Sequence, residues 1–304
     1  PESYPARKGC AMPEAEQGIN VARVALLLAG LPNSVSGMTV NRFCASGVQA
    51  VALAADRIRL GEADVMIAAG TESMSMVPMS GNKPAFNNAV FANDENLGIA
   101  YGMGMTAEKV AQQWGISRDA QDEFALNSHK KAIAAQEKGE FKDEITPFTF
   151  TKATPNLATG EIATKDTTAS LDEGPRADSS IEGLTKLRPV FAAKGSVTAG
   201  NSSQMSDGAG ALILASEDAV KRYNLTPRAR IAHMSVRAAD PIWMLTAPIP
   251  ATEYAMKKSG MKLEDIDLVE INEAFASVPM AWLLETGYPI EKTNVNGGAI
   301  ALGH

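Results

Sequence analysis

The fold class follows from one stretch of sequence, Met38-Thr39-Val40-Asn41-Arg42-Phe43-Cys44-Ala45-Ser46-Gly47. Residues 38–43 have strand character, and residues 44–47 form a tight turn before a helix predicted from about Val48 to Leu60. The run Val65–Gly70 that follows is continuously apolar, as expected of a parallel strand covered on both faces. We therefore predict a βαβ unit in an α/β protein.

Two later segments repeat this order of apolar run, polar or Gly-containing turn, and helix. Asp267–Ile271 precedes the turn Asn272–Phe275 and a helical stretch to about Thr286, and Asn294–Gly298 leads to Gly303 and His304. Further strand character is predicted at 209–215 and at 228–236. Each apolar run is expected to be a strand of a layered core.

The middle of the chain is of a different kind. Residues 78–98 and 152–180 are rich in Asn, Thr, Gly, Pro and Asp and are expected to be loops. Between them, 106–114 and 118–139 are predicted helices, the second with Ser117 as N-cap and Gly139 as its end. We predict an N-terminal half at 1–75, an inserted loop domain at 76–205 and a C-terminal half at 206–304.

Composition excludes several classes of protein. The chain has 304 residues, 45% of them hydrophobic, and a formal net charge of −7, so it lacks the basic field that attracts nucleic acid or anionic membranes. No apolar run reaches the length of a membrane span. Two cysteines, Cys10 and Cys44, cannot form a disulfide framework, which favours a reducing compartment. Because the chain begins at Pro1 and stops directly after a Gly-rich run, we expect a fragment lacking both ends.

Cys44 is the first candidate for chemistry. At a strand-to-helix junction, the free N–H groups and the positive end of the helix would stabilise a thiolate and lower its pKa. A buried structural cysteine is the alternative from the residues alone. Of the three histidines, His129 is expected on a solvated helix face and His233 in a structural strand position, whereas His304 follows a glycine-rich turn and is the candidate base, with a structural role still open.

Several motifs resemble the thiolase family, in family order and over nearly the whole chain. The residues 41–47 are similar to its acyl-cysteine motif, Asn272-Glu273-Ala274-Phe275-Ala276 to its NEAFA motif, and 294–304 to its NVNGGAIALGH motif. Further matches are found at 70–75, 103–108, 186–191 and 198–203. The resemblance implies the thiolase fold, with two βαβαβαββ halves in a layered αβαβα core and an inserted loop domain over coenzyme A, here incomplete at both termini.

The resemblance also implies roles for individual residues. Cys44 would carry the acyl group, His304 would activate the thiol, and Asn272 with His304 would position a water that polarises the thioester or keto oxygen. These roles make chemical sense, because a base raises the thiolate fraction and fixed donors stabilise developing negative charge. Coenzyme A, a substrate and not a permanently bound cofactor, would contact these residues: Ser203, Ala199, Arg176, Met244, Phe275 and Met103. No metal is expected.

We predict thiolytic cleavage of a 3-ketoacyl-CoA to acetyl-CoA and a shortened acyl-CoA, as in fatty acid beta-oxidation. The sequence Gly102-Met103-Gly104 departs from the branch that forms acetoacetyl-CoA, and 244–248 departs from a common family pattern near the tunnel, which leaves chain length open. The alternatives are an acetyl-CoA acetyltransferase, a non-catalytic acyl-CoA-binding protein and, more weakly, a cysteine hydrolase.

Other expectations concern the whole protein. The family's second cysteine, in a C-x-G motif beyond the histidine, does not occur in the 304 residues, so we expect this chain alone to be inactive in thiolysis or condensation. By analogy with the family we expect a homo-oligomer, a dimer or a tetramer. The expected location is the cytoplasm of a bacterium, or the mitochondrion or peroxisome of a eukaryote.

Overall fold

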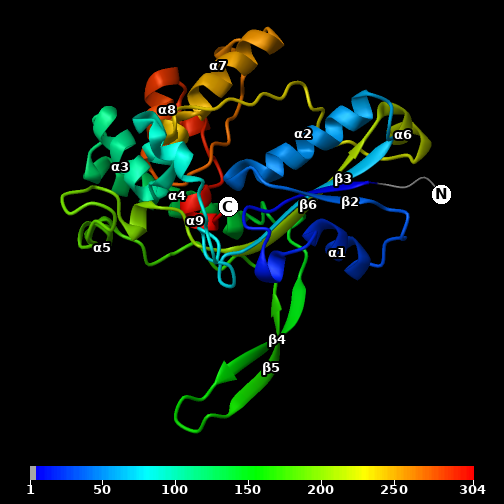
Figure 1. Cartoon of the computed structure of the whole chain (residues 1–304), viewed down its shortest axis with the longest axis horizontal. Helices are drawn as coiled ribbons and strands as arrows, with labels where there is room; N and C mark the ends of the chain where they lie inside the picture. The colour runs from blue at the N-terminus through cyan, green and yellow to red at the C-terminus, as the bar shows by residue number, and fades with distance from the viewer. Residues whose placement is uncertain (1–4) are drawn as a thin grey trace.

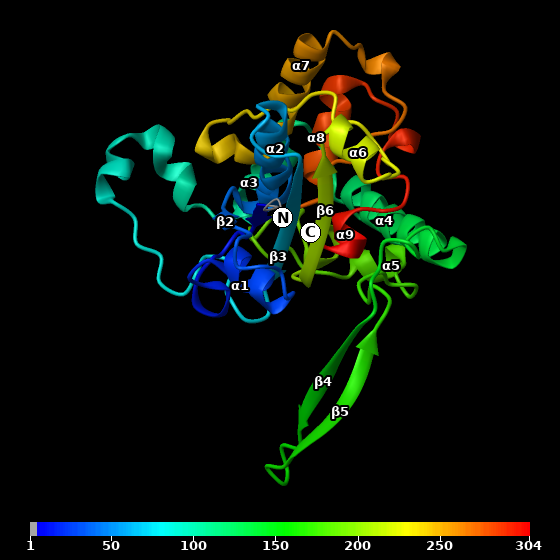
Figure 2. The same cartoon turned by 90° about the vertical axis from the view of Figure 1, so that its right-hand side faces the viewer.

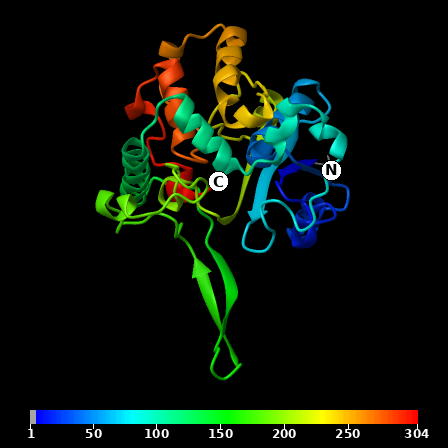
Figure 3. The ribbon, with the colours of Figure 1, turned by 60° about the vertical axis from the view of Figure 1, so that its left-hand side comes forward.

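The computed structural model describes residues 5–304. It contains a part built on a β-sheet, a part built of helices, and a two-stranded hairpin that projects away from both (Figure 1). The hairpin stands clear of the rest of the chain in the two other views as well (Figures 2 and 3).

The sheet has four strands in the order β2-β1-β3-β6. They are β1 (Ala6–Gly9), β2 (Gly37–Val40), β3 (Val65–Ser73) and β6 (Asp207–Ala215). β1 pairs in parallel with both β2 and β3, whereas β6 runs antiparallel to β3. The predicted βαβ unit is confirmed, with β1 lying between its two strands.

Two helices cover the sheet from opposite sides, α2 (Ser46–Arg59) above it and α1 (Val21–Leu28) below it in Figure 1. Small side chains let α2 approach closely, and the core there consists of Ala50, Ala54, Met66 and Ala68. A Cβ on Gly9 would lie 2.5 Å from the Ser46 carbonyl carbon, so only glycine permits this contact. The end of β1 is thereby fixed against the first turn of α2.

The helical part contains the segments of both predicted motifs near the C-terminus. Its helices are α3 (Met103–Gln113), α4 (Arg118–Lys138), α5 (Ile181–Thr185), α7 (Pro248–Ser259), α8 (Ser277–Thr286) and α9 (Ala299–Leu302); α6 (Glu217–Arg222) follows β6. The predicted ends of α4 are confirmed. Ser117 Oγ accepts a hydrogen bond from Ala120 N at 3.2 Å, and Gly139 has φ +75°.

Three expectations about strands were wrong. Residues 152–180 are not all loop, because β4 (Phe148–Pro155) pairs with β5 (Ile162–Ala169); their alternating threonines suit a strand, and Gly160 at φ +71° closes the turn. Residues 228–236 form no strand, since no described strand pairs with them. Near the C-terminus, the predicted strands at 267–271 and 294–298 are reduced to one parallel bridge, Val269 with Thr293.

Candidate active site

The loop that carries Cys44 is a 3-10 turn, Phe43–Ala45, placed between β2 and α2 as predicted. Phe43 has φ +46°, a conformation that is unusual for a bulky side chain and must be held by its surroundings. Asn41 Oδ1 accepts from Phe43 N at 2.8 Å, and Ser46 Oγ donates to Phe43 O at 2.6 Å. These contacts fix the direction in which the thiol is presented.

The expectation that the turn stabilises a thiolate was wrong. Cys44 is exposed as a residue, yet partial burial of its thiol raises the pKa of the Cys44 thiol. Its own backbone N–H lowers the pKa and the Glu72 carboxylate raises it. The two effects that raise the pKa, the loss of water and a nearby negative charge, are therefore larger together than the lowering by the backbone N–H. Cys44 is held as a neutral thiol, so nucleophilic attack requires a base.

The carboxylate of Glu273 joins three segments of the helical part. Glu273 is 1% exposed and accepts hydrogen bonds from Ser128 Oγ at 2.6 Å, Asn294 Nδ2 at 2.7 Å and Ile300 N at 3.1 Å. A Cβ on Gly298 would lie 2.3 Å from the Glu273 carboxyl carbon. Because both sequence motifs contribute to this contact, the loop carrying Asn272 and the helix before His304 form one unit.

Asn272 is exposed. It directly follows Ile271, whose backbone N–H and C=O are both hydrogen-bonded to Asn294. Asn294 Oδ1 accepts from Ile271 N at 2.8 Å, and Asn294 Nδ2 donates to Ile271 O at 2.9 Å. The Asn294 side chain thus replaces a paired strand at this point. The backbone before Asn272 is rigid, while its side chain remains available.

His304 follows α9 and Gly303, whose φ is +78°. Gln204 Nε2 fixes the end of α9, since it donates to Ala301 O at 2.6 Å and to Gly174 O at 2.8 Å. Burial lowers the pKa of His304. Its imidazole is therefore neutral at neutral pH and able to accept a proton.

The sheet topology brings Cys44 and His304 to the same edge. β2, which precedes Cys44, and β3 both end there, and the antiparallel β6 begins there. Ser206, the residue before β6, lies so close to Gly303 that a Cβ on this glycine would be 2.4 Å from its hydroxyl oxygen. In all three views the marked C-terminus lies between the sheet and the helical part (Figures 1, 2 and 3).

Most of the residues assigned to coenzyme A lie around the segment 199–203. Ser203 N donates to Ala274 O at 2.9 Å, so this segment runs beside the motif that contains Phe275. Phe275 is buried in a cluster that Met103 also contacts. Ala199 is exposed, and Met244 is half-buried, next to a leucine that packs on the same cluster.

Arg176 lies on the surface, paired with Asp178 at 3.3 Å. Its backbone N donates to His129 Nδ1 at 3.2 Å, and His129 is only 6% exposed, so the expectation of a solvated helix face for His129 was wrong. The segment around residue 176 covers this part of α4. Burial lowers the pKa of His129, and the Arg176 charge lowers it further.

His233 is half-buried, and its Nε2 has no partner among the described residues.

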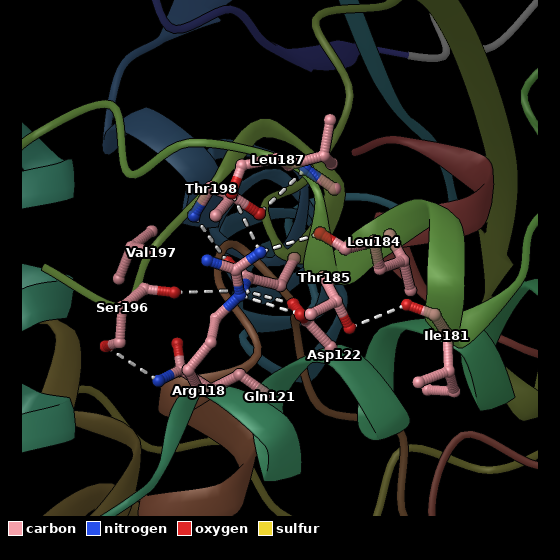
Figure 4. A network of polar contacts seen from close by, with 12 residues as sticks. Arg118, Gln121, Asp122, Ile181, Leu184, Thr185, Leu187, Ser196, Val197 and Thr198 are labelled. Carbon is pink, nitrogen blue, oxygen red and sulfur yellow. Dashed lines mark hydrogen bonds and ion pairs between the residues drawn. The ribbon is translucent and has the colours of Figure 1, made fainter.

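A polar network around Arg118 and Asp122 lies next to Ser196, Val197 and Thr198, at the start of the segment 196–203 (Figure 4). Arg118 pairs with Asp122 at 2.7 Å and donates to Leu184 O at 2.7 Å and Leu187 O at 3.0 Å. Asp122 also accepts from Asn201 Nδ2 at 2.9 Å. A partly buried network in which Arg118 and Asp122 are paired holds the proposed coenzyme A segment in place.

Two cavities, of about 530 Å³ and 500 Å³, lie beside α3. The first is lined by Glu108 and Lys194, among others, and the second by Trp114 and Trp243; neither is lined by Cys44 or His304.

Within residues 5–304 no cluster of three acidic, cysteine or histidine side chains could hold a metal ion. Over the same residues, no helix is long and apolar enough to cross a membrane.

Sequence reasoning assigned no role to Glu72, Ser128, Glu273 or Gln204, although these residues hold the site together. Glu72 and Glu273 both lie inside motifs that resemble the family, Glu72 two residues after the apolar run 65–70 and Glu273 directly before Ala274 and Phe275. That position was the signal in the sequence for a structural role, because a carboxylate near buried apolar residues needs hydrogen-bond donors. Ser128 and Gln204 carried no such signal, since their partners come from distant segments.

Models of two family domains match the chain. "Thiolase, N-terminal domain" matches residues 9–218 and "Thiolase, C-terminal domain" matches residues 225–304. A 3-ketoacyl-CoA thiolase from Bacillus subtilis (strain 168) is 46% identical over 97% of this chain and 75% of its own length. A steroid 3-ketoacyl-CoA thiolase from Mycobacterium tuberculosis is 43% identical over 97% of this chain and 71% of its own length.

Solved structures agree with these matches. Human mitochondrial 3-ketoacyl-CoA thiolase superposes with a TM-score of 0.85 at 39% identity, over 99% of this chain and 76% of that one. The Bacillus anthracis acetyl-CoA acetyltransferase also gives 0.85 at 39% identity, over 100% of this chain and 76% of that one. The predicted thiolase fold is confirmed by these likenesses.

Proposed function

The chain belongs to the thiolase family, and from this premise we propose that it is an acyl-CoA C-acyltransferase that cleaves 3-ketoacyl-CoA thiolytically. The observation that carries the proposal is the placement of Cys44 and His304 at one edge of the sheet, with the pKa of the thiol raised and that of the imidazole lowered. A neutral thiol and a neutral imidazole at the same edge of the sheet are the resting state from which a base-assisted attack begins.

In the proposed reaction His304 accepts the proton of the Cys44 thiol as the sulfur attacks the 3-keto carbon. A C–S bond forms and the bond between carbons 2 and 3 breaks, so that acetyl-CoA leaves with the electron pair and its carbon 2 takes up the proton that His304 accepted. Asn272 and His304 position a water that polarises the reacting oxygen. The thiol of a second coenzyme A then takes the acyl group from Cys44, and the proton of that thiol goes to the Cys44 sulfur.

We assign coenzyme A to the segment around Ser203 and Ala199, with Met103, Met244 and Phe275 near the pantetheine and Arg176 near the nucleotide. The rigid support of this segment by Asp122 and Asn201 favours the assignment, because a preformed site binds its ligand at a lower entropic cost. Arg176 is an exposed cation in an acidic chain. It is suited to a phosphate group.

A second candidate is the acetyl-CoA acetyltransferase reaction, which condenses two acetyl-CoA molecules. It is favoured by the equal structural likeness to a protein of that name. The two candidates differ in the acyl group that Cys44 accepts. Mass spectrometry of Cys44 after incubation with acetyl-CoA or octanoyl-CoA tests them: faster octanoyl transfer supports the first candidate, and transfer confined to acetyl supports the second.

We also propose a homo-oligomer, a dimer or tetramer, and a three-part division at residues 75 and 205. The hairpin β4–β5, with both edges unpaired within residues 5–304, supports an oligomer because an isolated hairpin is marginally stable in water.

For location we propose the cytoplasm of a bacterium, or the mitochondrion or peroxisome of a eukaryote. The bacterial source of the curated relatives above favours the first.

A further inference from the structure

Glu72, the penultimate residue of β3, has no part in the proposed reaction, yet its carboxylate anchors the turn that follows β1. Its two oxygens accept hydrogen bonds from Ala11 N at 2.5 Å, Met12 N at 3.3 Å and Gln17 Nε2 at 2.7 Å. Two consecutive backbone N–H groups and a side-chain amide thus converge on one partly buried carboxylate. Charge-assisted bonds of this kind are stronger than neutral ones and fix the turn in place.

The fixed turn is connected to the loop that carries the thiol. Ala11 O accepts from Asn41 Nδ2 at 2.9 Å, and Asn41 Oδ1 in turn accepts from Phe43 N at 2.8 Å. Phe43, at φ +46°, immediately precedes Cys44. A continuous line of hydrogen bonds therefore runs from Glu72 through Ala11 and Asn41 to the backbone of the strained residue beside the nucleophile.

Glu72 is itself prevented from turning away. Gln17 is 5% exposed, and besides donating to Glu72 it donates to Met12 O at 3.1 Å and accepts from Ser73 N at 2.7 Å. The carboxylate is thereby held between the residue after it in β3 and the turn after β1. Its charge acts on Cys44 from a fixed position.

The charged and titratable groups near these residues come from several elements. Cys10 Sγ lies 3.9 Å from a Glu72 oxygen, and Lys8 on β1 interacts electrostatically with Cys10. On the Cys44 loop, the Arg42 guanidinium is directed to Gln49 at 2.8 Å. Among residues 5–304, the charge that acts on Cys44 is that of Glu72, and it raises the pKa of that thiol.

We propose that Glu72 is a positioning residue for Cys44, which holds the thiol loop in place through Ala11 and Asn41. Its negative charge also opposes formation of the thiolate. In the resting protein the thiol stays protonated and protected from adventitious electrophiles. Proton removal is left to the base that acts when substrate is present. The proposal concerns the thiol of the proposed function, but it is tested without turnover.

The test follows two properties of the Cys44 loop in the 304-residue chain. The rate of Cys44 alkylation by iodoacetamide, assigned by peptide mass spectrometry, is measured against pH, and deuterium uptake is measured in peptides covering residues 38–47. Glu72→Gln removes the charge and keeps the shape. Glu62→Gln is the matched control, because Glu62 is an exposed carboxylate paired with Arg57.

Glu72→Gln is expected to move the alkylation midpoint to a lower pH than in Glu62→Gln, since a charge that disfavours the thiolate is lost. It is also expected to increase deuterium uptake in the loop. Asn41→Ala should increase uptake without the charge effect. Midpoint and uptake equal to those of Glu62→Gln would overturn the proposal. If Glu72→Gln does not fold, the Asn41→Ala variant provides the test. Deuterium uptake in residues 38–47 that is unchanged in Asn41→Ala would then overturn the proposal. Neither result bears on the acyl-transfer proposal, which is tested separately by acyl transfer to Cys44.

Discussion

The Glu273 carboxylate accepts a 2.6 Å hydrogen bond from Ser128 Oγ and thereby joins α4 to the loop that carries Asn272. The same Ser128 oxygen accepts from Gly298 N at 3.1 Å, at the start of α9. One hydroxyl group thus connects a helix of the proposed loop domain to both C-terminal motifs. It is one of the contacts that hold the loop carrying Asn272 and the helix before His304.

Ser128→Ala should therefore destabilise the chain. The change leaves the buried Glu273 carboxylate with one donor fewer and Gly298 N without an acceptor, which costs about 1–3 kcal/mol. Urea unfolding followed by circular dichroism measures the loss. Ser170→Ala, at an exposed serine, is the control and should change the unfolding free energy by less than about 0.5 kcal/mol. Equal stability of the two variants would contradict the role given to Ser128.

Asn201→Ala should weaken coenzyme A binding as well as stability. Asn201 is fully buried; its side chain donates to Asp122 and to Ser196 O, and its backbone oxygen accepts from Ala276 N at 2.9 Å. Loss of the side chain leaves Asp122 short of a donor and loosens the segment that leads to Ser203. Isothermal titration with coenzyme A should show roughly tenfold weaker binding. Unchanged affinity in a folded variant would remove this segment from the proposed site.

Arg176 and Asp178 should have opposite effects on coenzyme A. Arg176→Ala removes a cation that the proposal places at the nucleotide end, whereas Asp178→Asn releases that cation from its 3.3 Å ion pair. We expect the first variant to weaken binding by roughly threefold and the second to strengthen it, both more strongly at low ionic strength. Titrations at two salt concentrations check this. Weaker binding by both variants would contradict the assignment.

Two histidines should make stability depend on pH. Burial lowers the pKa of His304 and of His129, so between the folded values and the ordinary value of about 6.5 the unfolded chain binds more protons. Stability should therefore rise with pH through this window, and it should be lost as the pH falls through the window, with no further change from these two groups below the folded values. Urea midpoints between about pH 5 and 7 measure the slope. His304→Gln should reduce it; a slope equal to that of the unaltered chain would contradict the direction given for His304.

Local signals in the sequence were enough to predict the elements that depend on their own residues. The Ser117 and Gly139 ends of α4 follow from capping and from left-handed backbone geometry, and the βαβ unit follows from helical and strand spacing. Residues 228–236 show the limit of such signals. Their alternation is that of a strand, but a strand requires a partner, and no described segment supplies one.

The candidate site shows the same limit in its electrostatics. The placement of Cys44 before a helix was predictable, whereas its raised pKa depends on partial burial and on Glu72, which lies 28 positions along the chain. The burial of His129 depends likewise on a segment near residue 176. Long-range neighbours decide these properties, and a single sequence does not show them. The roles of Cys44, Asn272 and His304 were inferred from motifs and stay predictions.

The most direct measurement is transfer of an acetyl group from acetyl-CoA to the chain, followed by peptide mass spectrometry. We predict an acetyl thioester on Cys44 and equimolar release of coenzyme A, with no adduct in Cys44→Ala. In His304→Ala we predict transfer slowed by roughly a hundredfold or more, as for the loss of a general base. A folded chain that binds acetyl-CoA but gains no acetyl group on Cys44, or gains it on Cys10, would contradict the proposed function.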